Sequence, residues 1–173
     1  MTGLPYKIAT LLYAFNRQDE VLLMRRNKAP NLGLWSPAGG KLEQALGESP
    51  YQCAVRESAE ELNLVLQPSD LHLTGLVSEC GYEGEAHWLM FLFEIKPRLS
   101  ELPVDMEEGH FQFFPRQQLA TLPLPLTDKE KIWPAFWEHR HGFFAAHCHY
   151  AGPSTYQWDL YSSQPTPPPR QHS

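Results

Sequence analysis

The chain has 173 residues, 42% hydrophobic and 12% aromatic, and its 14 Lys and Arg against 20 Asp and Glu give a net charge of −6. A chain of this length buries about two-thirds of its unfolded surface, which is enough for one core without disulfides or structural zinc. The three cysteines, Cys53, Cys80 and Cys148, show no CxxC spacing. Their spacing argues against a disulfide framework and a zinc knuckle, and favours a reducing compartment.

Targeting and charge point to the cytoplasm. Residues 1–20 lack a signal-peptide pattern, and the longest strongly apolar stretch, residues 88–93, is far too short to span a membrane. We therefore predict a cytoplasmic protein without a membrane partner. Because binding to duplex nucleic acid depends on Lys and Arg, the acidic balance also predicts no duplex partner. A polyphosphate ligand would need metal ions to neutralise its charge.

The first third of the chain predicts strands followed by a loop. Apolar segments at residues 6–15 and 21–25, separated by a turn-like segment, predict a strand pair. Residues 27–40 hold two prolines and three glycines around Leu34 and Trp35. This composition predicts an ordered binding loop without a regular element.

A helix is predicted over residues 50–62. Ser49 is a suitable N-cap, Pro50 fits the first helical position, and Gln52 can complete a capping box. Asn63 can end the helix because Asn tolerates a left-handed backbone.

The rest of the chain predicts strands and one more helix, with Thr127 and Asp128 capping a helix over residues 129–138. An acidic, proline-containing loop is predicted at residues 99–109. The predicted strands are residues 71–78, 87–95, 111–114, 142–150 and 155–161. We predict one domain over residues 1–161 and a disordered tail, rich in Ser, Pro and Gln, over residues 162–173.

Three carboxylates share one face of the first predicted helix. At about 100° per residue, Glu57, Glu60 and Glu61 lie within an arc of about 100°. Their mutual repulsion costs a few tenths of a kcal/mol per pair, which a bound divalent cation would reverse. Carboxylate oxygens are ligands that Mg²⁺ prefers. A solvated acidic face is the alternative interpretation.

Residues 40–64 resemble the Nudix box, whose pattern is G-x5-E-x7-R-E-U-x-E-E-x-G-U with U aliphatic. The spacing from Glu48 to Arg56 and on to Glu61 fits this pattern without a gap. Three positions depart from it. Seven residues separate Gly40 from Glu48, Ser58 replaces an aliphatic residue, and Asn63 replaces the last glycine. No departure removes a carboxylate or the arginine.

The resemblance implies an α/β fold, an α/β/α sandwich with a mixed central sheet. It also implies Mg²⁺- or Mn²⁺-dependent hydrolysis of a nucleoside diphosphate linked to another group. The implied metal ligands are Gly40, through its carbonyl, Glu57, Glu60 and Glu61. The implied catalytic residues are Glu48, Arg56, Glu57 and Glu60, with Glu48 and Arg56 forming an ion pair. The general base stays open among Glu57, Glu60, Glu107 and Glu108.

The flanking segments resemble one branch of this family. Residues 22–41 are similar to MutT-type enzymes, and residues 141–160 to the closing strands of the animal oxidised-purine triphosphatase. This resemblance implies cleavage of an oxidised or unmodified purine (d)NTP to (d)NMP and pyrophosphate. The implied substrate-binding residues are Arg26, Trp35, Ser36, Lys41, Glu108 and Asp128. Because Ser36 stands where the animal enzyme has Asn, the base preference stays open.

Two other functions stay open. Tyr82 lies near the position of a Tyr in dinucleoside polyphosphate hydrolases, and a non-catalytic nucleotide-binding module would carry the same scaffold. Among the aromatic residues, Trp35 is the strongest candidate to stack on a base, and Trp88 is also available. Phe113 and Trp133 lie on amphipathic elements and are predicted to be core. The expected partner is a small nucleotide, and the oligomeric state is not predicted.

Overall fold

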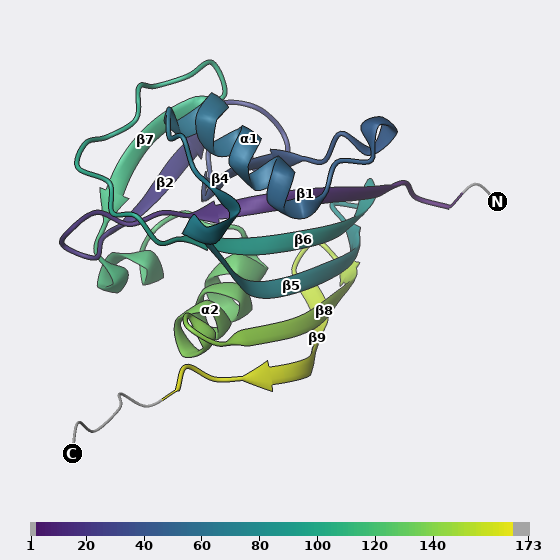
Figure 1. Ribbon diagram of the computed structural model, residues 1–173. Coiled ribbons are helices and arrows are strands. Elements are labelled where there is room, and N and C mark those ends of the chain that lie inside the picture. The colour runs from purple at the N-terminus through teal and green to yellow at the C-terminus, as the bar shows by residue number, and fades with distance from the viewer. Residues whose placement is uncertain (1–2, 168–173) are drawn as a thin grey trace.

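The computed structural model describes residues 3–167. Its centre is a six-stranded sheet with the strand order β4-β1-β6-β5-β8-β9 (Figure 1). These strands are β1 Tyr6–Tyr13, β4 Ala38–Lys41, β5 Leu71–Tyr82, β6 Ala86–Ile95, β8 Phe143–Gly152 and β9 Thr155–Gln164. β1 runs parallel to β6 and β5 parallel to β8, and the other neighbours are antiparallel. The sheet is therefore mixed, as the sequence predicted.

A second sheet of three antiparallel strands lies beside the first, in the order β3-β2-β7. It contains β2 Val21–Arg26, β3 Trp35–Ser36 and β7 Gly109–Phe114. The predicted pairing of the first two strands was wrong, since β1 and β2 lie in different sheets. The segments are linked beyond the end of β1, by a bridge from Phe15 to Val21 and a hydrogen bond from the Leu22 N–H to the Ala14 carbonyl. Residues 21–24 of β2 are all buried, and alternate residues enter the two core clusters. A strand covered on both faces cannot form a half-exposed hairpin.

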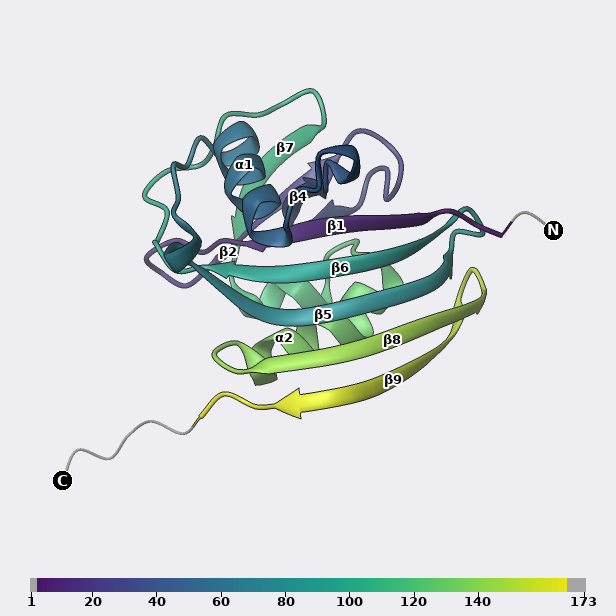
Figure 2. The same ribbon diagram turned by 45° about the vertical axis from the view of Figure 1, so that its right-hand side comes forward.

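Two α-helices, α1 Pro50–Leu62 and α2 Trp133–His139, cover opposite faces of the six-stranded sheet (Figures 1 and 2). The two core clusters lie under these helices, one against α2 and one against α1. The four remaining helical turns are η1 Gln44–Leu46, η2 Pro68–Asp70, η3 Arg116–Ala120 and η4 Asp128–Ile132. This arrangement confirms the predicted α/β sandwich. No helix among the described residues is long and apolar enough to cross a membrane.

Helix α1 begins and ends where the sequence predicted. The Ser49 hydroxyl accepts the Gln52 N–H at 3.2 Å, and the Gln52 side chain accepts the Ser49 N–H at 2.9 Å, which completes the capping box. Asn63 ends the helix with φ of 52°. Both ends are thus fixed by local chemistry.

The second predicted helix begins differently. A wide turn of π type, η4, precedes α2, and the Thr127 side chain caps neither element. Thr127 instead donates a hydrogen bond to Glu79 on β5, because its hydroxyl is buried and turned toward the sheet. The prediction that Thr127 caps the helix was therefore wrong.

Two other boundaries differ from the prediction. Residues 27–40, expected to hold no regular element, contain β3 and most of β4, because their backbones pair with β2 and β1. At the other end, β9 continues to Gln164, and the Ser163 hydroxyl lies 2.7 Å from the buried His139 ring. Part of the predicted tail therefore packs, whereas residues 168–173 lie outside the described residues.

Candidate active site

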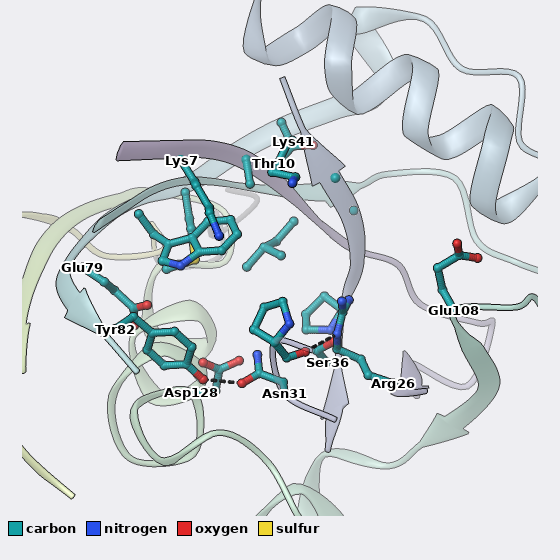
Figure 3. A pocket seen from close by; sticks show the side chains of 18 of the residues that line it. Lys7, Thr10, Arg26, Asn31, Ser36, Lys41, Glu79, Tyr82, Glu108 and Asp128 are labelled. Carbon is teal, nitrogen blue, oxygen red and sulfur yellow. Dashed lines mark hydrogen bonds between the residues drawn. The ribbon is translucent and has the colours of Figure 1, made fainter. Parts of the chain in front are cut away.

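A cavity of about 360 Å³ lies on the α2 side of β1 and β6 and reaches β4 and helix α1 (Figure 3). The loop over residues 27–34 and the start of η4 complete its walls. One end is formed by Gly39, Gly40 and Glu61. Figure 3 shows Lys7, Glu79, Tyr82 and Asp128 grouped at one side and Glu108 at the opposite side. The cavity therefore joins Glu61, one of the three α1 carboxylates, to a second group of ionisable side chains.

The α1 carboxylates are fitted against the backbone of β4. Glu61 accepts the Gly39 N–H at 2.9 Å. Glu57 lies so close to Gly40 that a Cβ at this glycine would stand 2.1 Å from Glu57 Oε1. Only glycine at position 40 leaves room for a buried carboxylate here, whereas a Cβ at Gly39 would stand 2.1 Å from the Thr10 carbonyl oxygen.

Arg56 is the centre of an ion-pair network in front of these carboxylates. Its Nε and Nη2 donate to the two oxygens of Glu48 at 2.8 and 2.9 Å. Its Nη1 donates to Glu57 at 2.7 Å and to Glu60 at 3.1 Å. The Glu48–Arg56 pair implied by the resemblance is therefore present. The Arg56 guanidinium lowers the pKa of Glu48 from 4.5 to about 2.

This pKa makes the contribution of Glu48 to stability dependent on pH. A depressed pKa in the folded state stabilises the protein above pH 4.5, and the contribution is lost as the pH falls toward about 2. Replacing Glu48 with Gln should lower the free energy of unfolding at pH 7 by about 1–2 kcal/mol. Urea unfolding of both proteins from pH 7 to pH 2.5 should show this difference shrinking below pH 4.5. A constant difference would contradict the pair's role.

Burial raises the pKa of both carboxylates that face β4. For Glu57 burial outweighs the opposing effect of Arg56, and for Glu61 it raises the pKa to about 7 despite the Gly39 hydrogen bond. Glu57 is buried and Glu61 is half-buried, and two acids whose charged forms are disfavoured by burial favour a bound cation. Because their ligand atoms are all oxygen, a hard cation such as Mg²⁺ is suitable. Mg²⁺ is commonly bound by one or two carboxylates together with water and substrate phosphates. The residues therefore fit the implied metal.

Glu60 differs from the other two carboxylates. Its side chain is 57% exposed and pairs with Arg56, whereas the Glu57 side chain is 11% exposed. Within residues 3–167, no three His, Cys, Asp or Glu side chains converge on a common metal position. The three carboxylates thus do not form one cluster in this arrangement, and Glu57 and Glu61 are the pair that faces Gly39 and Gly40.

The close approach of Gly40 to Glu57 gives a direct test. In Gly40→Ala, the new methyl group and the Glu57 carboxylate cannot both keep their places. Glu57 can rotate away, so we expect weaker metal binding and at least about 10-fold lower activity with little loss of fold. Titration with Mn²⁺ and circular dichroism would measure the two effects. Gly152→Ala at the end of β8 is the control, since nothing lies within 4 Å of its new methyl and its backbone is not left-handed. Unchanged Mn²⁺ affinity in Gly40→Ala would contradict this role of Glu57.

Two further acids lie at the other end of the cavity. Glu79 is 4% exposed, and burial raises its pKa to about 7. Burial and the neighbouring charge of Glu79 raise the pKa of Asp128 to about 8. Asp128 lies beside Tyr82, whose hydroxyl donates to the Asn31 side chain across the cavity (Figure 3). At neutral pH this end can therefore both accept and donate hydrogen bonds.

The model of the NUDIX domain matches residues 5–135 of this chain. The chain belongs to the Nudix family. The match covers β1 to β7, α1 and η4 but not β8 and β9, and it makes the chain a Nudix hydrolase, as the resemblance implied. Nudix proteins generally use divalent metal ions such as Mg²⁺, in agreement with the carboxylate oxygens of Glu57 and Glu61 that face Gly39 and Gly40.

Solved structures similar to this one confirm the fold. The mutator MutT protein of Bacillus halodurans has a TM-score of 0.69 at 22% identity, over 89% of this chain and 97% of its own. MutT of Methanosarcina mazei has a TM-score of 0.66 at 23% identity, over 79% of this chain and 96% of its own. The NUDIX domain of Shewanella oneidensis NrtR, solved with ADP-ribose, has a TM-score of 0.59 at 18% identity, over 78% of this chain and 87% of its own.

NrtR has also been solved with a 27mer DNA. The expectation that this Nudix chain binds no duplex nucleic acid therefore stays a prediction.

The predicted substrate-binding residues of this Nudix protein gather at the cavity with one exception. Five of them line it: Arg26, Ser36, Lys41, Glu108 and Asp128. Trp35 does not, contrary to our expectation. It is 7% exposed and packs edge-on against His110 and Phe114. β3 places its side chain in the core between the sheets, and Trp88 is the tryptophan that lines the cavity.

Sequence reasoning missed Lys7, Thr10 and Glu79, all of which line the cavity. The signal for Glu79 was its position two residues after Val77 on a strand, which puts both side chains on one face. Val77 is fully buried, so an acid on the same face is also buried. Lys7 shares a face with Ala9 and Leu11 in the same way.

Proposed function

We propose that this Nudix hydrolase belongs to the MutT-like branch and cleaves a purine (d)NTP to (d)NMP and pyrophosphate. The observation that carries the proposal is one cavity that joins three features. At one end lies Glu61 with Gly39 and Gly40, and Glu57 stands directly against Gly40. Cationic side chains lie in the walls, and Trp88 lies at the other end with polar groups. A nucleoside triphosphate has the same order of parts: phosphates for the carboxylate end and a base for the aromatic end.

The proposed metal ligands are Glu57 and Glu61, with Glu60 and the Gly40 carbonyl completing the set when the cation is bound. A bound Mg²⁺ would neutralise phosphate charge and lower the pKa of the attacking water. Arg56 holds Glu57 and Glu60 in reach and is held in turn by Glu48. Arg56 and Glu48 thus act by positioning the ligands.

Arg26 and Lys41 are the proposed phosphate-binding cations. Both line the cavity, and Arg26 is fixed by the hydrogen bond from its Nε to the Pro30 carbonyl at 2.7 Å. Arg26 therefore has Nη groups free of this contact for a phosphate. Lys41 is exposed at the rim, where it can follow the triphosphate into the cavity.

We propose a shorter set of candidates for the general base. Glu108 lines the cavity, whereas Glu107 is 83% exposed and pairs with Lys28 at 2.9 Å. A base must reach the attacking water, so Glu107 is not a candidate in this arrangement. Glu57, Glu60 and Glu108 remain proposed bases.

Trp88 supports the base end of the proposal. Its ring lines the cavity and can stack on a nucleobase, a contact worth about 1–3 kcal/mol. Asp128 and Ser36 line the same cavity and can bond to a base edge. Tyr82 also lines it, which keeps dinucleoside polyphosphates as the second candidate substrates.

The test is pyrophosphate release with Mg²⁺ from 8-oxo-dGTP, dGTP and dATP, alongside hydrolysis of diadenosine tetraphosphate and ADP-ribose. The proposal expects the highest kcat/KM with one of the triphosphates, and products identified as the monophosphate and pyrophosphate. Faster cleavage of diadenosine tetraphosphate would favour the second candidate. Nucleotide binding without turnover of any compound would instead support a non-catalytic module and refute the proposal.

A further inference from the structure

Lys7, Trp88 and Glu79 form a row across three neighbouring strands. Lys7 on β1 is the register partner of Trp88 on β6, and Trp88 is the register partner of Glu79 on β5. Partners on adjacent strands point to the same face of a sheet. All three side chains line the cavity. Because strands are about 4.8 Å apart, the Lys7 and Glu79 backbones lie about 10 Å apart, one on each side of the tryptophan.

Lys7 brings a positive charge to this row. Its Nζ lies 5.2 Å from the centre of the Trp88 ring. Among the described residues, Lys7 forms no salt bridge with a carboxylate. The aromatic face attracts the ammonium group but accepts no conventional hydrogen bond from it. Its three donors therefore remain available to a ligand that rests on Trp88.

Glu79 brings an acceptor to the opposite side. Its Oε1 accepts hydrogen bonds from the Thr127 hydroxyl at 3.2 Å and the Tyr150 hydroxyl at 3.3 Å. These bonds hold the carboxyl group in place, and no partner of Oε2 is recorded among residues 3–167. A buried acid that lines a cavity with one oxygen unused is positioned to accept an N–H from a ligand.

We propose that the row of Lys7, Trp88 and Glu79 selects 6-oxopurines over 6-aminopurines. This inference rests on the proposed function and names its base. The purine stacks on Trp88, its carbonyl oxygen accepts a hydrogen bond from Lys7, and its ring N–H donates to Glu79. In guanine the 2-amino group also donates, to Glu79 or to Asp128 beside it. Lys7 and Glu79 lie on opposite sides of the ring, as a carbonyl and an amino group do on a guanine edge.

Adenine fits this row poorly. It has an amino group where the 6-oxopurines have the carbonyl oxygen, so it faces the Lys7 ammonium with a donor. The ammonium group has only donors and cannot pair with it. A site built to bond a particular group discriminates strongly, because the wrong ligand leaves a desolvated polar group unpaired. Lys7 is thus the residue on which the preference depends.

Lys7→Met tests the proposal, because methionine keeps an unbranched side chain against Trp88 and removes the charge. Steady-state kinetics with Mg²⁺ would compare ITP, GTP and ATP for the wild type, Lys7→Met and the conservative Lys7→Arg. We expect Lys7→Met to lower kcat/KM for ITP and GTP by at least about 10-fold and for ATP by less than about 3-fold. Lys7→Arg should recover part of the preference.

Two results would overturn the proposal. Equal losses with all three nucleotides would show that Lys7 binds phosphate, and unchanged kinetics would show that it does not contact the substrate. Titration calorimetry with IMP, GMP and AMP gives a readout that does not depend on turnover. If the wild type hydrolyses nothing but binds IMP and GMP more tightly than AMP, and Lys7→Met loses that difference, the proposed function fails while this inference stands.

Glu79→Gln separates the two sides of the row. Glutamine keeps an acceptor for Thr127 and Tyr150 and replaces the other oxygen with a donor. We expect GTP to lose at least about 10-fold in kcat/KM. Glu83→Gln, at an exposed position in the same hairpin, is the matched control. An unchanged ratio of GTP to ATP in Glu79→Gln would remove this residue from the proposed row.

Discussion

Replacing Glu61 with Gln should lower kcat for nucleotide hydrolysis by at least about 100-fold without unfolding the protein. Glutamine keeps the acceptor for the Gly39 N–H but removes the negative charge from the cavity. Burial disfavours the charged form of Glu61, so the neutral side chain should not lower stability. Metal-assisted hydrolysis depends on a cation that the protein holds in place, so its loss should raise the activation free energy. A 100-fold loss in rate corresponds to about 2.8 kcal/mol, since about 1.4 kcal/mol is tenfold.

Kinetics over a range of Mg²⁺ concentrations, with thermal unfolding of the same samples, would measure both effects. Glu107→Gln is the matched control because this exposed side chain pairs only with Lys28 outside the cavity. Glu60→Gln should lower kcat less than Glu61→Gln does, if the exposed Glu60 side chain contributes less to metal binding. Wild-type turnover in Glu61→Gln would contradict the role of the carboxylate pair facing Gly39 and Gly40.

The parts of this site that the sequence predicted are those set by local chemistry. Helix α1 begins at a capping box and ends at Asn63, and both signals lie within a few residues of the ends they fix. The fixed spacing of Glu48, Arg56 and Glu57 then puts the ion pair and the buried carboxylate together. The mixed sheet was correctly predicted, but from the resemblance to a family.

The parts that the sequence did not predict depend on contacts between distant segments. Trp35 lies in a segment rich in Gly and Pro, yet its side chain is core because β3 pairs with β2. Lys7 and Glu79 face one cavity only because β6 lies between β1 and β5. Strand order and register of this kind arise from long-range packing, which hydrophobic periodicity does not specify.

Replacement of Arg140 should have a larger effect on stability than replacement of Glu48, Glu61 or Arg98. Its Nε donates to Glu94 at 3.0 Å, and its Nη1 and Nη2 donate to the two oxygens of Asp19 at 2.8 and 2.7 Å. Its guanidinium also lies 3.9 Å from the centre of the Phe15 ring. Glu94 is 3% exposed, and its Oε2 has no hydrogen-bond partner among the described residues. The arginine is therefore the main counter-charge of a buried carboxylate.

Arg140→Met should lower the free energy of unfolding by about 3–5 kcal/mol, because it leaves the buried Glu94 charge with only the longer contacts to Arg98 at 3.7 Å and His141 at 3.9 Å. Urea unfolding at pH 7 would measure the loss. Arg98→Met is the control: this side chain is 37% exposed and lies 3.7 Å from Glu94, so we expect a loss below about 1 kcal/mol. Arg140→Met combined with Glu94→Gln should be less destabilised than Arg140→Met alone, since the unpaired charge is gone. Additive losses in the double variant would mean that packing on Phe15, and not the ion pair, determines the effect of Arg140.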